Sequence, residues 1–201
     1  MTNQAANPWE VPASGPSAAL ARQTGSHVPR IESARLVLRA PRLEDFPAYA
    51  AILMSNRARH MGGPFSRRDA WLDFTQYIAG WQLRGAGMWA AEHRETGAVA
   101  GFFSAGMEYG DHEHELGYLL ADRFEGQGLA AEAIAAVRDF ALSALELPSL
   151  VSYVDPGNSR SARAAERTGA SRDSDAEAAF DAPVLVFRHA LPNRSGMEAS
   201  T

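Results

Sequence analysis

A glycine-containing turn directly precedes a long amphipathic stretch, and this arrangement limits the folds open to the chain. Residues 123–128 read R-F-E-G-Q-G, and residues 129–145 are rich in Ala, Leu and Glu. Apolar side chains recur there at helical spacing, and Pro148 stops the pattern because proline cannot continue a helix. These apolar positions are Leu129, Ala133, Val137, Phe140 and Ala144. The sequence therefore predicts a turn that opens a helix over 129–145.

The turn has the chemistry of an anion site. The first N–H groups of a helix have no partner inside the helix, and they suit a negatively charged ligand. Gly126 and Gly128 let the backbone come close to a phosphate, while Ala130 and Ala131 keep the first helical turn narrow. A G-x-G turn is also common without any ligand. The motif by itself therefore leaves an anion site and an ordinary glycine turn both open.

The rest of the chain has the patterns of alternating strands and helices. Residues 35–39 alternate polar and apolar side chains as a half-buried strand does, and Ser66 with Asp69 three residues later is a capping-box pattern. Residues 95–97 form a turn signal between two apolar stretches, which predicts a hairpin. The expected strands are 35–39, 88–92, 98–105, 113–120, 150–154 and 184–189, and the expected helices are 43–53, 66–85, 129–145 and 158–168. This order predicts an α/β domain with a mixed, mostly antiparallel sheet.

One domain is expected between two flexible ends. A chain of 201 residues with 46% apolar and 21% charged side chains is long enough for one buried core. Residues 1–29 mix Pro, Ser, Gly, Ala and Gln without apolar periodicity, so we expect a flexible extension there and a similar tail over 193–201. The domain is then expected over residues 30–192.

Composition excludes several classes of function. The chain has no cysteine, so it can form neither a disulfide, a thiolate zinc site nor a cysteine nucleophile. Its net charge of -5 argues against binding to nucleic acid, because such proteins concentrate positive charge. No apolar run approaches the roughly 18 residues of a membrane span, and no secretory signal opens the chain. We expect a cytoplasmic protein with neither nucleic acid nor membrane as a partner.

Several separated motifs resemble one family. Arg123 to Gly128, opening a helix, is similar to the acyl-CoA pyrophosphate motif of the GNAT acetyltransferases. Four further motifs resemble one branch of this family, the ribosomal-protein-alanine (RimJ/RimL-type) N-acetyltransferases. They are R-L-V-L-R at 35–39, E-L-G-Y at 115–118, A-A-E-A at 130–133 and V-D-P-G-N-S-R-S at 154–161. The resemblance implies the GNAT (acyl-CoA N-acyltransferase) fold, with helices flanking a sheet in which two parallel strands splay apart. It also implies acetyl-CoA as the cosubstrate.

The same resemblance implies which residues hold acetyl-CoA, in a cleft between strands 113–120 and 150–154. The implied contacts are the backbone of Tyr118 and Leu119 for pantetheine and thioester, Gly126, Gln127, Gly128, Leu129 and Ala130 for the pyrophosphate, and Asn158 for the pantetheine arm. Arg123 would add charge to the phosphates, or stay a solvated surface arginine. Arg160, Arg163 and Arg167 on the following helix either reach the adenosine phosphate or are solvated.

Candidate catalytic residues lie on both sides of the turn. Without a cysteine, direct attack of the amine on the thioester is the simplest route. Glu115 stands where the resemblance implies the family's strand glutamate, close to the implied thioester, so we expect it to accept the amine proton, directly or through water. Glu113 is the second choice, and for both a surface acid is the alternative. Ser161 or Ser159 would protonate the leaving thiolate, or would cap the helix. Many GNAT enzymes use a tyrosine for that step, and none stands on the corresponding helix, which leaves the general acid open.

Two further patterns have simpler structural explanations. His112 and His114 alternate on a strand and suggest a metal site, but no further ligand is obvious, and we expect no metal. Trp71, Phe74 and Trp81 recur at helical spacing, which predicts a core face rather than a wall of the acceptor cleft.

The acceptor is the least constrained part of the prediction. An α-amino group with a pKa of about 7.7–8.0 is roughly a tenth to a fifth neutral at pH 7, whereas a lysine is about 0.04% neutral. We therefore expect a primary amine at a protein or peptide N-terminus. A small amine (antibiotic, polyamine or amino acid) and a non-catalytic acyl-CoA-binding module are the alternatives. Ala170 stands where the family usually has an aromatic residue, which leaves residues 170–182 unpredicted. The oligomeric state is open, a homodimer included.

Overall fold

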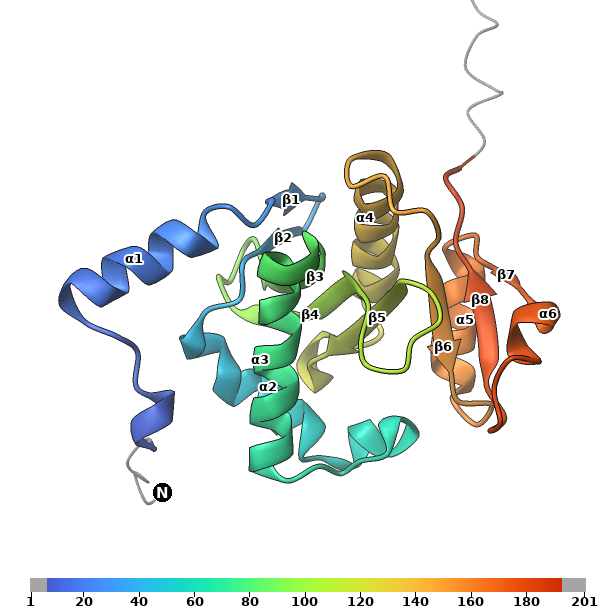
Figure 1. Cartoon of the computed structure of the whole chain (residues 1–201), viewed down its shortest axis with the longest axis horizontal. Coiled ribbons are helices and arrows are strands. Elements are labelled where there is room, and N and C mark those ends of the chain that lie inside the picture. The colour runs from blue at the N-terminus through green and yellow to red at the C-terminus, as the bar shows by residue number, and fades with distance from the viewer. Residues whose placement is uncertain (1–6, 193–201) are drawn as a thin grey trace, which may run out of the picture.

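Residues 7–192 are described by a computed structural model, in which they fold around one sheet of eight strands (Figure 1). The strand order is β1-β2-β3-β4-β5-β6-β8-β7, and neighbouring strands are antiparallel except β5 and β6. The strands are β1 (Ile31–Glu32), β2 (Leu36–Arg39), β3 (Gly87–His93), β4 (Val99–Gly106), β5 (Glu115–Leu120), β6 (Val151–Val154), β7 (Ser171–Arg172) and β8 (Leu185–Arg188). The α-helices are α1 (Gly15–Gly25), α2 (Phe46–Leu53), α3 (Arg67–Arg84), α4 (Leu129–Ser143), α5 (Ser159–Arg167) and α6 (Ser174–Glu177). The mixed, mostly antiparallel sheet expected from the sequence is confirmed.

The sheet is the middle layer of the fold, because alternate residues of its strands face opposite sides. Trp89 and Ala91 of β3 belong to the apolar cluster that contains α4, whereas Met88 and Ala90 belong to the cluster that contains α2 and α3. The buried residues of α4 are Leu129, Ala133, Ile134, Val137, Arg138 and Ala141. They include three positions of the predicted apolar stripe.

Helix α3 begins and ends as its sequence predicts. Ser66 caps it by accepting a hydrogen bond from a backbone N–H of the first turn, and Gly85 ends it in the left-handed conformation with a φ of 68°. Phe74 is fully buried, and Trp71 and Trp81 are partly buried against the apolar clusters. The aromatic face of α3 is therefore a core face, as expected.

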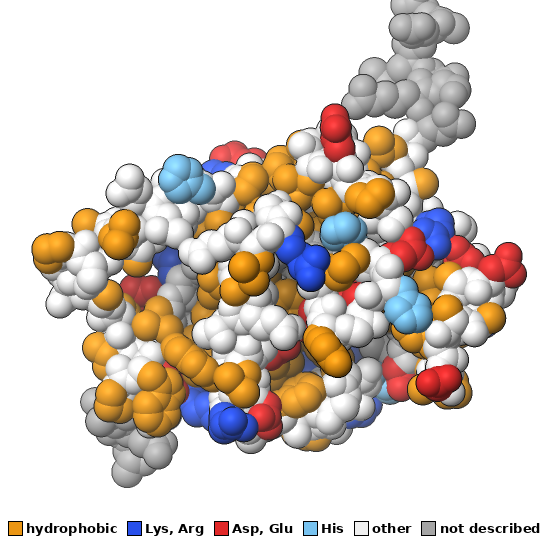
Figure 2. Space-filling view, viewed as in Figure 1, with side chains coloured by type: hydrophobic (Ala, Val, Ile, Leu, Met, Phe, Trp, Pro, Cys, Tyr) orange, Lys and Arg blue, Asp and Glu red, His pale blue; other side chains and the backbone are white. Residues whose placement is uncertain are grey.

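The N-terminal segment contains a helix that the sequence does not predict. Helix α1 has no buried residue, and Trp9, Val11 and Leu20 expose more than half of their surface. Hydrophobic side chains are visible on the surface of the N-terminal segment at the left of Figure 2. Glu10 forms an ion pair with Arg67 at the start of α3, at a distance of 2.5 Å, which attaches this segment to the domain. The expected tail 193–201 lies outside the described residues, as do residues 1–6.

The stretch left unpredicted after α5 forms β7 and α6. Strand β7 pairs with β8, and Asp173 caps α6 while accepting a hydrogen bond from Arg188 at 2.7 Å. The other nitrogens of Arg188 donate to the carboxylate of Glu113 at 2.7 and 2.8 Å. One predicted boundary is corrected, because β5 begins only at Glu115, where its pairing with β4 starts opposite Gly106.

Candidate active site

Strands β5 and β6 separate to form a deep cleft. Within the described chain they pair at one position, Glu115 with Val151, and then diverge. The cleft has a volume of about 930 Å³ and is bordered by β5, β6 and the first turns of α4 and α5. In Figure 1, β6 stands with β8 and α5 on one side, and α2 and α3 lie on the other. The splayed parallel strands implied by the family resemblance are therefore present.

The glycine turn before α4 forms one part of this cleft. Gly126 and Gly128 have φ angles of 71° and 77°, which residues with a Cβ rarely adopt. Gly128 caps α4 without a side-chain hydrogen bond, and the N–H of Glu132 donates to its carbonyl oxygen. The N–H groups of residues 129–131 thus have no acceptor within the helix. Such groups are suitable donors to the oxygens of a phosphate.

Most residues predicted at the site border the cleft. They are Glu115, Tyr118, Leu119, Gly126, Gly128, Leu129, Ala130, Asn158 and Ser161. Two other side chains already have partners on the outer surface of the turn. The guanidinium of Arg123 lies 4.9 Å above the ring of Phe124, and the side chain of Gln127 donates to the carbonyl oxygen of Arg123 at 2.9 Å. The structure therefore does not bring the side chains of Arg123 and Gln127 to the cleft.

Arginines from outside the turn bring positive charge to the cleft. Arg57, from the 3-10 helix η3 (Asn56–Met61), and Arg160 of α5 both border the cleft and pair with Glu125 of the turn, Arg160 at 2.5 Å. Arg163 and Arg167 border it as well. Arg57 was not predicted, because it precedes its partner by 68 residues and no local pattern links the two.

Glu115 stands where the two strands part. Burial raises the pKa of its carboxyl group to about 8, and the carboxylates of Asp111 and Glu108 act in the same direction. The backbone N–H of Tyr153 opposes this shift by stabilising the charged form. A carboxyl group with such a pKa is suited to exchange a proton with an amine near neutral pH.

The hydroxyl group of Tyr118 reaches from β5 toward α5. It lies 3.4 Å from the hydroxyl oxygen of Ser161, and the ring of Tyr118 stacks on Phe103 with 5.9 Å between centroids. A phenol is a stronger acid than an aliphatic alcohol. From the sequence only the backbone of Tyr118 was predicted at the site, because the tyrosine of this family was sought on the helix.

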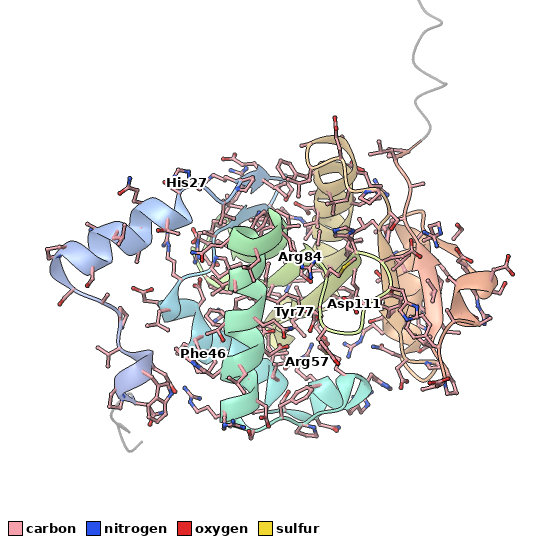
Figure 3. All side chains as sticks on the ribbon, in the orientation of Figure 1. His27, Phe46, Arg57, Tyr77, Arg84 and Asp111 are labelled. Carbon is pink, nitrogen blue, oxygen red and sulfur yellow. The ribbon has the colours of Figure 1, made fainter. Side chains whose placement is uncertain are left out.

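A wall of acidic and phenolic side chains borders the cleft beside the start of β5. Tyr77 donates a hydrogen bond to Glu108, and Tyr49 donates one to Asp73. Burial raises the pKa of both carboxyl groups, while their tyrosine partners lower it. Figure 3 labels Tyr77 on α3 and Asp111 in the β4–β5 loop near the centre of the view, and Glu108 links the two by accepting a hydrogen bond from Tyr77 and donating its backbone N–H to Asp111. The sequence carries one signal for this wall, since Asp73 and Tyr77 are four residues apart on one helix face.

The residues near Glu113 serve structural contacts. Glu113, the second choice for a base, pairs with Arg188, and His112 stacks on Phe180 with 4.6 Å between centroids. Burial lowers the pKa of His114. Residues 7–192 contain no group of three His, Cys, Asp or Glu side chains placed to hold a metal ion. Over the same residues, each helix is too short or too polar to cross a membrane.

One splayed parallel pair in an otherwise antiparallel sheet, with a cleft at the splay and a glycine turn opening a helix toward it, defines the class of acyl-CoA N-acyltransferases. The chain belongs to the GNAT acetyltransferase family. The model of the acetyltransferase (GNAT) domain matches residues 35–171.

Known proteins show the same likeness. An acetyltransferase structure from Agrobacterium tumefaciens str. C58 is 39% identical, with a TM-score of 0.76, over 81% of this chain and 95% of that one. RimL, the ribosomal L7/L12 alpha-N-protein acetyltransferase, solved with coenzyme A, shares the fold at 21% identity and a TM-score of 0.64, over 81% of this chain and 98% of its own. The uncharacterized YkkB of Bacillus subtilis (strain 168) is 32% identical over 87 residues, 42% of this chain and 51% of YkkB. That match thus spans about half of YkkB.

Proposed function

We propose that this protein transfers the acetyl group of acetyl-CoA to a primary amine at the N-terminus of a protein or peptide. The observation that carries the proposal is the position of Glu115, whose carboxyl group has a pKa raised to about 8 where β5 and β6 part. The volume of about 930 Å³ and the free N–H groups at the start of α4 fit a ligand with a pyrophosphate. Membership of the GNAT family supports acetyl-CoA as the acetyl donor.

Each cleft residue has a defined task in this reaction. Acetyl-CoA supplies the activated thioester. Glu115 accepts one proton from the attacking amine as the new N–C bond forms. Tyr118, with Ser161 beside it, donates one proton to the sulfur as the C–S bond breaks, so that the products are an amide and free CoA. The N–H groups of residues 129–131 and the guanidinium of Arg160 hold the phosphates.

The pKa of Glu115 favours an α-amine over a lysine side chain. An α-amino group has a pKa of about 7.7–8.0, whereas a lysine has one of about 10.4. Because the carboxyl group has a pKa of about 8, transfer of a proton from an α-ammonium group to Glu115 is nearly balanced in free energy. Glu115 releases this first proton to solvent before the neutral amine attacks, and it can then accept the second proton as the amide forms. The same transfer from a lysine would be strongly uphill.

The acidic wall favours a second candidate, a small acceptor with two positive charges such as a polyamine or an aminoglycoside. Asp73 raises the pKa of Glu108, and Glu108 raises that of Glu115, so the three carboxyl groups interact along the cleft. A second ammonium group beside Glu108 would be attracted by these charges. A peptide with a single α-amine would leave them without a counter-charge.

The release of free CoA from acetyl-CoA tests both candidates. The panel contains peptides with free N-termini, amino acids, polyamines and aminoglycosides. The chain has no lysine, so acetyl groups that mass spectrometry finds on side-chain amines belong to the acceptor. A kcat/KM for peptides at least tenfold above that for polyamines supports the first candidate, and the reverse order supports the second.

The variant Glu108→Gln separates the candidates further. It should lower polyamine turnover roughly tenfold and spare a peptide whose α-amine is its only positive charge, since one charge-assisted contact contributes about 1.5 kcal/mol. Acetyl-CoA binding without release across the panel would indicate the non-catalytic module. An enzyme that binds no acetyl-CoA would overturn the whole proposal.

A further inference from the structure

A buried serine occupies the point where β5 and β6 part. The hydroxyl of Ser152, on β6, donates a hydrogen bond to the carbonyl oxygen of Leu116, on β5, at 2.6 Å. Nε2 of His189, the residue after β8, lies 2.9 Å from the same hydroxyl oxygen. A serine has one hydroxyl proton, and it is directed to Leu116, so His189 is the donor in the second contact. Ser152 and His189 are only 9% and 5% exposed, and both border the cleft.

The serine takes the place of a backbone hydrogen bond of the sheet. In a parallel pair, every second N–H of one strand is directed to the neighbouring strand. The N–H of Val151 donates to the carbonyl oxygen of His114 at 2.9 Å, so the next N–H of β6 on this side is that of Tyr153. In a continued ladder it would donate to Leu116, but within the described residues the two strands pair at one position only. The hydroxyl of Ser152 satisfies that carbonyl without β6 lying alongside β5.

Because the hydroxyl of Ser152 bonds to the carbonyl of Leu116, the N–H of Tyr153 is not needed there. This N–H then acts on the carboxyl group of Glu115, whose pKa it lowers. If β6 closed onto β5, the N–H would return to the carbonyl of Leu116 and Glu115 would lose its donor. The separation of the strands and the environment of Glu115 therefore depend on the same hydroxyl group.

His189 acts as a neutral brace for Ser152. Burial lowers the pKa of its imidazole to about 4, and the guanidinium of Arg138 acts in the same direction. An imidazole of that pKa is too weak a base to activate a serine at neutral pH, so the pair is not a nucleophile with its base. Nδ1 of His189 is buried without a hydrogen-bond partner in the described region, which costs stability. The ring therefore donates its Nε2–H to Ser152, while its Nδ1 is left without a partner.

We infer that Ser152, braced by His189, is a positioning residue that holds β5 and β6 apart for the pantetheine arm of acetyl-CoA and directs the Tyr153 N–H to Glu115. It touches neither the amine nor the thioester. The part that concerns acetyl-CoA rests on the proposed function, whereas the separation of the strands does not.

The variant Ser152→Ala tests this inference. Without the hydroxyl, the Tyr153 N–H should bond to Leu116 and narrow the cleft. We expect the Kd for acetyl-CoA to rise roughly tenfold, by about one net hydrogen bond. The rising limb of kcat/KM against pH should move to higher pH, because Glu115 loses its donor. The amide of Tyr153 should exchange its hydrogen more slowly than in the wild type.

A matched control separates positioning from stability. Thr168→Val also removes a buried hydroxyl that donates to carbonyl oxygens, here those of Ala164 and Ala165. Thr168 itself does not border the cleft, and its bonds stay within α5 instead of crossing between β5 and β6. It should lower the melting temperature and leave the Kd for acetyl-CoA within about twofold. An unchanged Kd in Ser152→Ala, or an equal rise in Thr168→Val, would overturn the inference.

The histidine gives a second, independent pair of variants. His189→Leu removes the donor at similar volume and should raise the Kd as Ser152→Ala does, whereas His189→Gln keeps a donor near Nε2 and should restore most of the affinity. Equal affinities of these two variants for acetyl-CoA would contradict the role of His189 in holding Ser152. If Ser152→Ala does not fold, the two His189 variants decide the question. If the wild type itself binds no acetyl-CoA, the proposed function fails. Even then, amide hydrogen exchange at Tyr153 that is faster or unchanged in Ser152→Ala would refute the claim that Ser152 holds β5 and β6 apart.

Discussion

The hydroxyl groups of Tyr118 and Ser161 lie 3.4 Å apart, and their pairing joins strand β5 to helix α5 across the mouth of the cleft. Tyr118 comes from the strand that also carries Glu115, three residues earlier. The proposed proton acceptor and proton donor therefore belong to one strand, and because they are three residues apart their side chains point to opposite faces of it. This arrangement explains how a chain without a tyrosine on α5 can still present a phenol there.

Replacing Tyr118 with Phe should separate its chemical role from its packing. The ring would keep its stack on Phe103, so the free energy of unfolding should change by less than about 1 kcal/mol. Loss of the proton donor should lower kcat roughly 10²-fold. Ser161→Ala, which leaves the phenol in place, should lower kcat less than about tenfold. Steady-state CoA release measures both, and an equal loss in the two variants would place the donor elsewhere.

The pH dependence of turnover should report on Glu115. Its pKa of about 8 means that the carboxylate form grows as pH rises through 8, so kcat/KM of the wild type should rise and level off above that value. Glu115→Gln cannot accept a proton and should lower kcat/KM by roughly 10²-fold while losing this limb. A profile for Glu115→Gln that overlays that of the wild type would remove Glu115 from the mechanism.

The same group should make the fold less stable as pH rises. Between the ordinary pKa of 4.5 and the folded value of about 8, the folded protein holds a proton that the unfolded chain has released. The free energy of unfolding therefore falls with rising pH in this window, by on the order of 5 kcal/mol for the full shift. Glu115→Gln should flatten that decline, gaining stability relative to the wild type at pH 8–9 but not at pH 4–5. Thermal melts of both proteins across pH 4–9 measure the difference, and parallel curves would contradict the raised pKa.

Gly126→Ala should weaken acetyl-CoA binding more than its backbone strain alone explains. A Cβ at Gly126 meets no atom within 4 Å in the free protein, but the left-handed φ costs an alanine roughly 1 kcal/mol. Gly97→Ala is the matched control, because Gly97 has a φ of 65°, open space around it and a place in the β3–β4 turn. Calorimetry should show a similar loss of stability in both variants, with a rise in Kd of about tenfold or more only for Gly126→Ala. Equal Kd values for the Gly126→Ala and Gly97→Ala variants would show that this turn does not bind the pyrophosphate.

Much of the fold follows from local signals. Ser66 and Gly85 bound α3 because a cap and a left-handed glycine act within one helical turn. The glycines before Leu129 open α4 for the same reason. The boundary at Glu113 was wrong because the strand begins where its pairing with β4 begins, opposite Gly106, and no local pattern records that position.

The sequence by itself determined six of the strands, the four helices α2 to α5, the glycine turn and the family, because helix periods, caps and turns depend on neighbours along the chain. It did not predict β1, β7, α1 or α6. Only the tertiary structure decided which side chains share the cleft. The sheet order places β8 next to β6, and this brings His189 to Ser152 across 37 residues. The same order places β5 beside β6, which is followed by α5, and so brings Tyr118 to Ser161 across 43 residues. Such contacts depend on how strands pair in space, and the free energy that selects the pairing belongs to the whole core rather than to any segment.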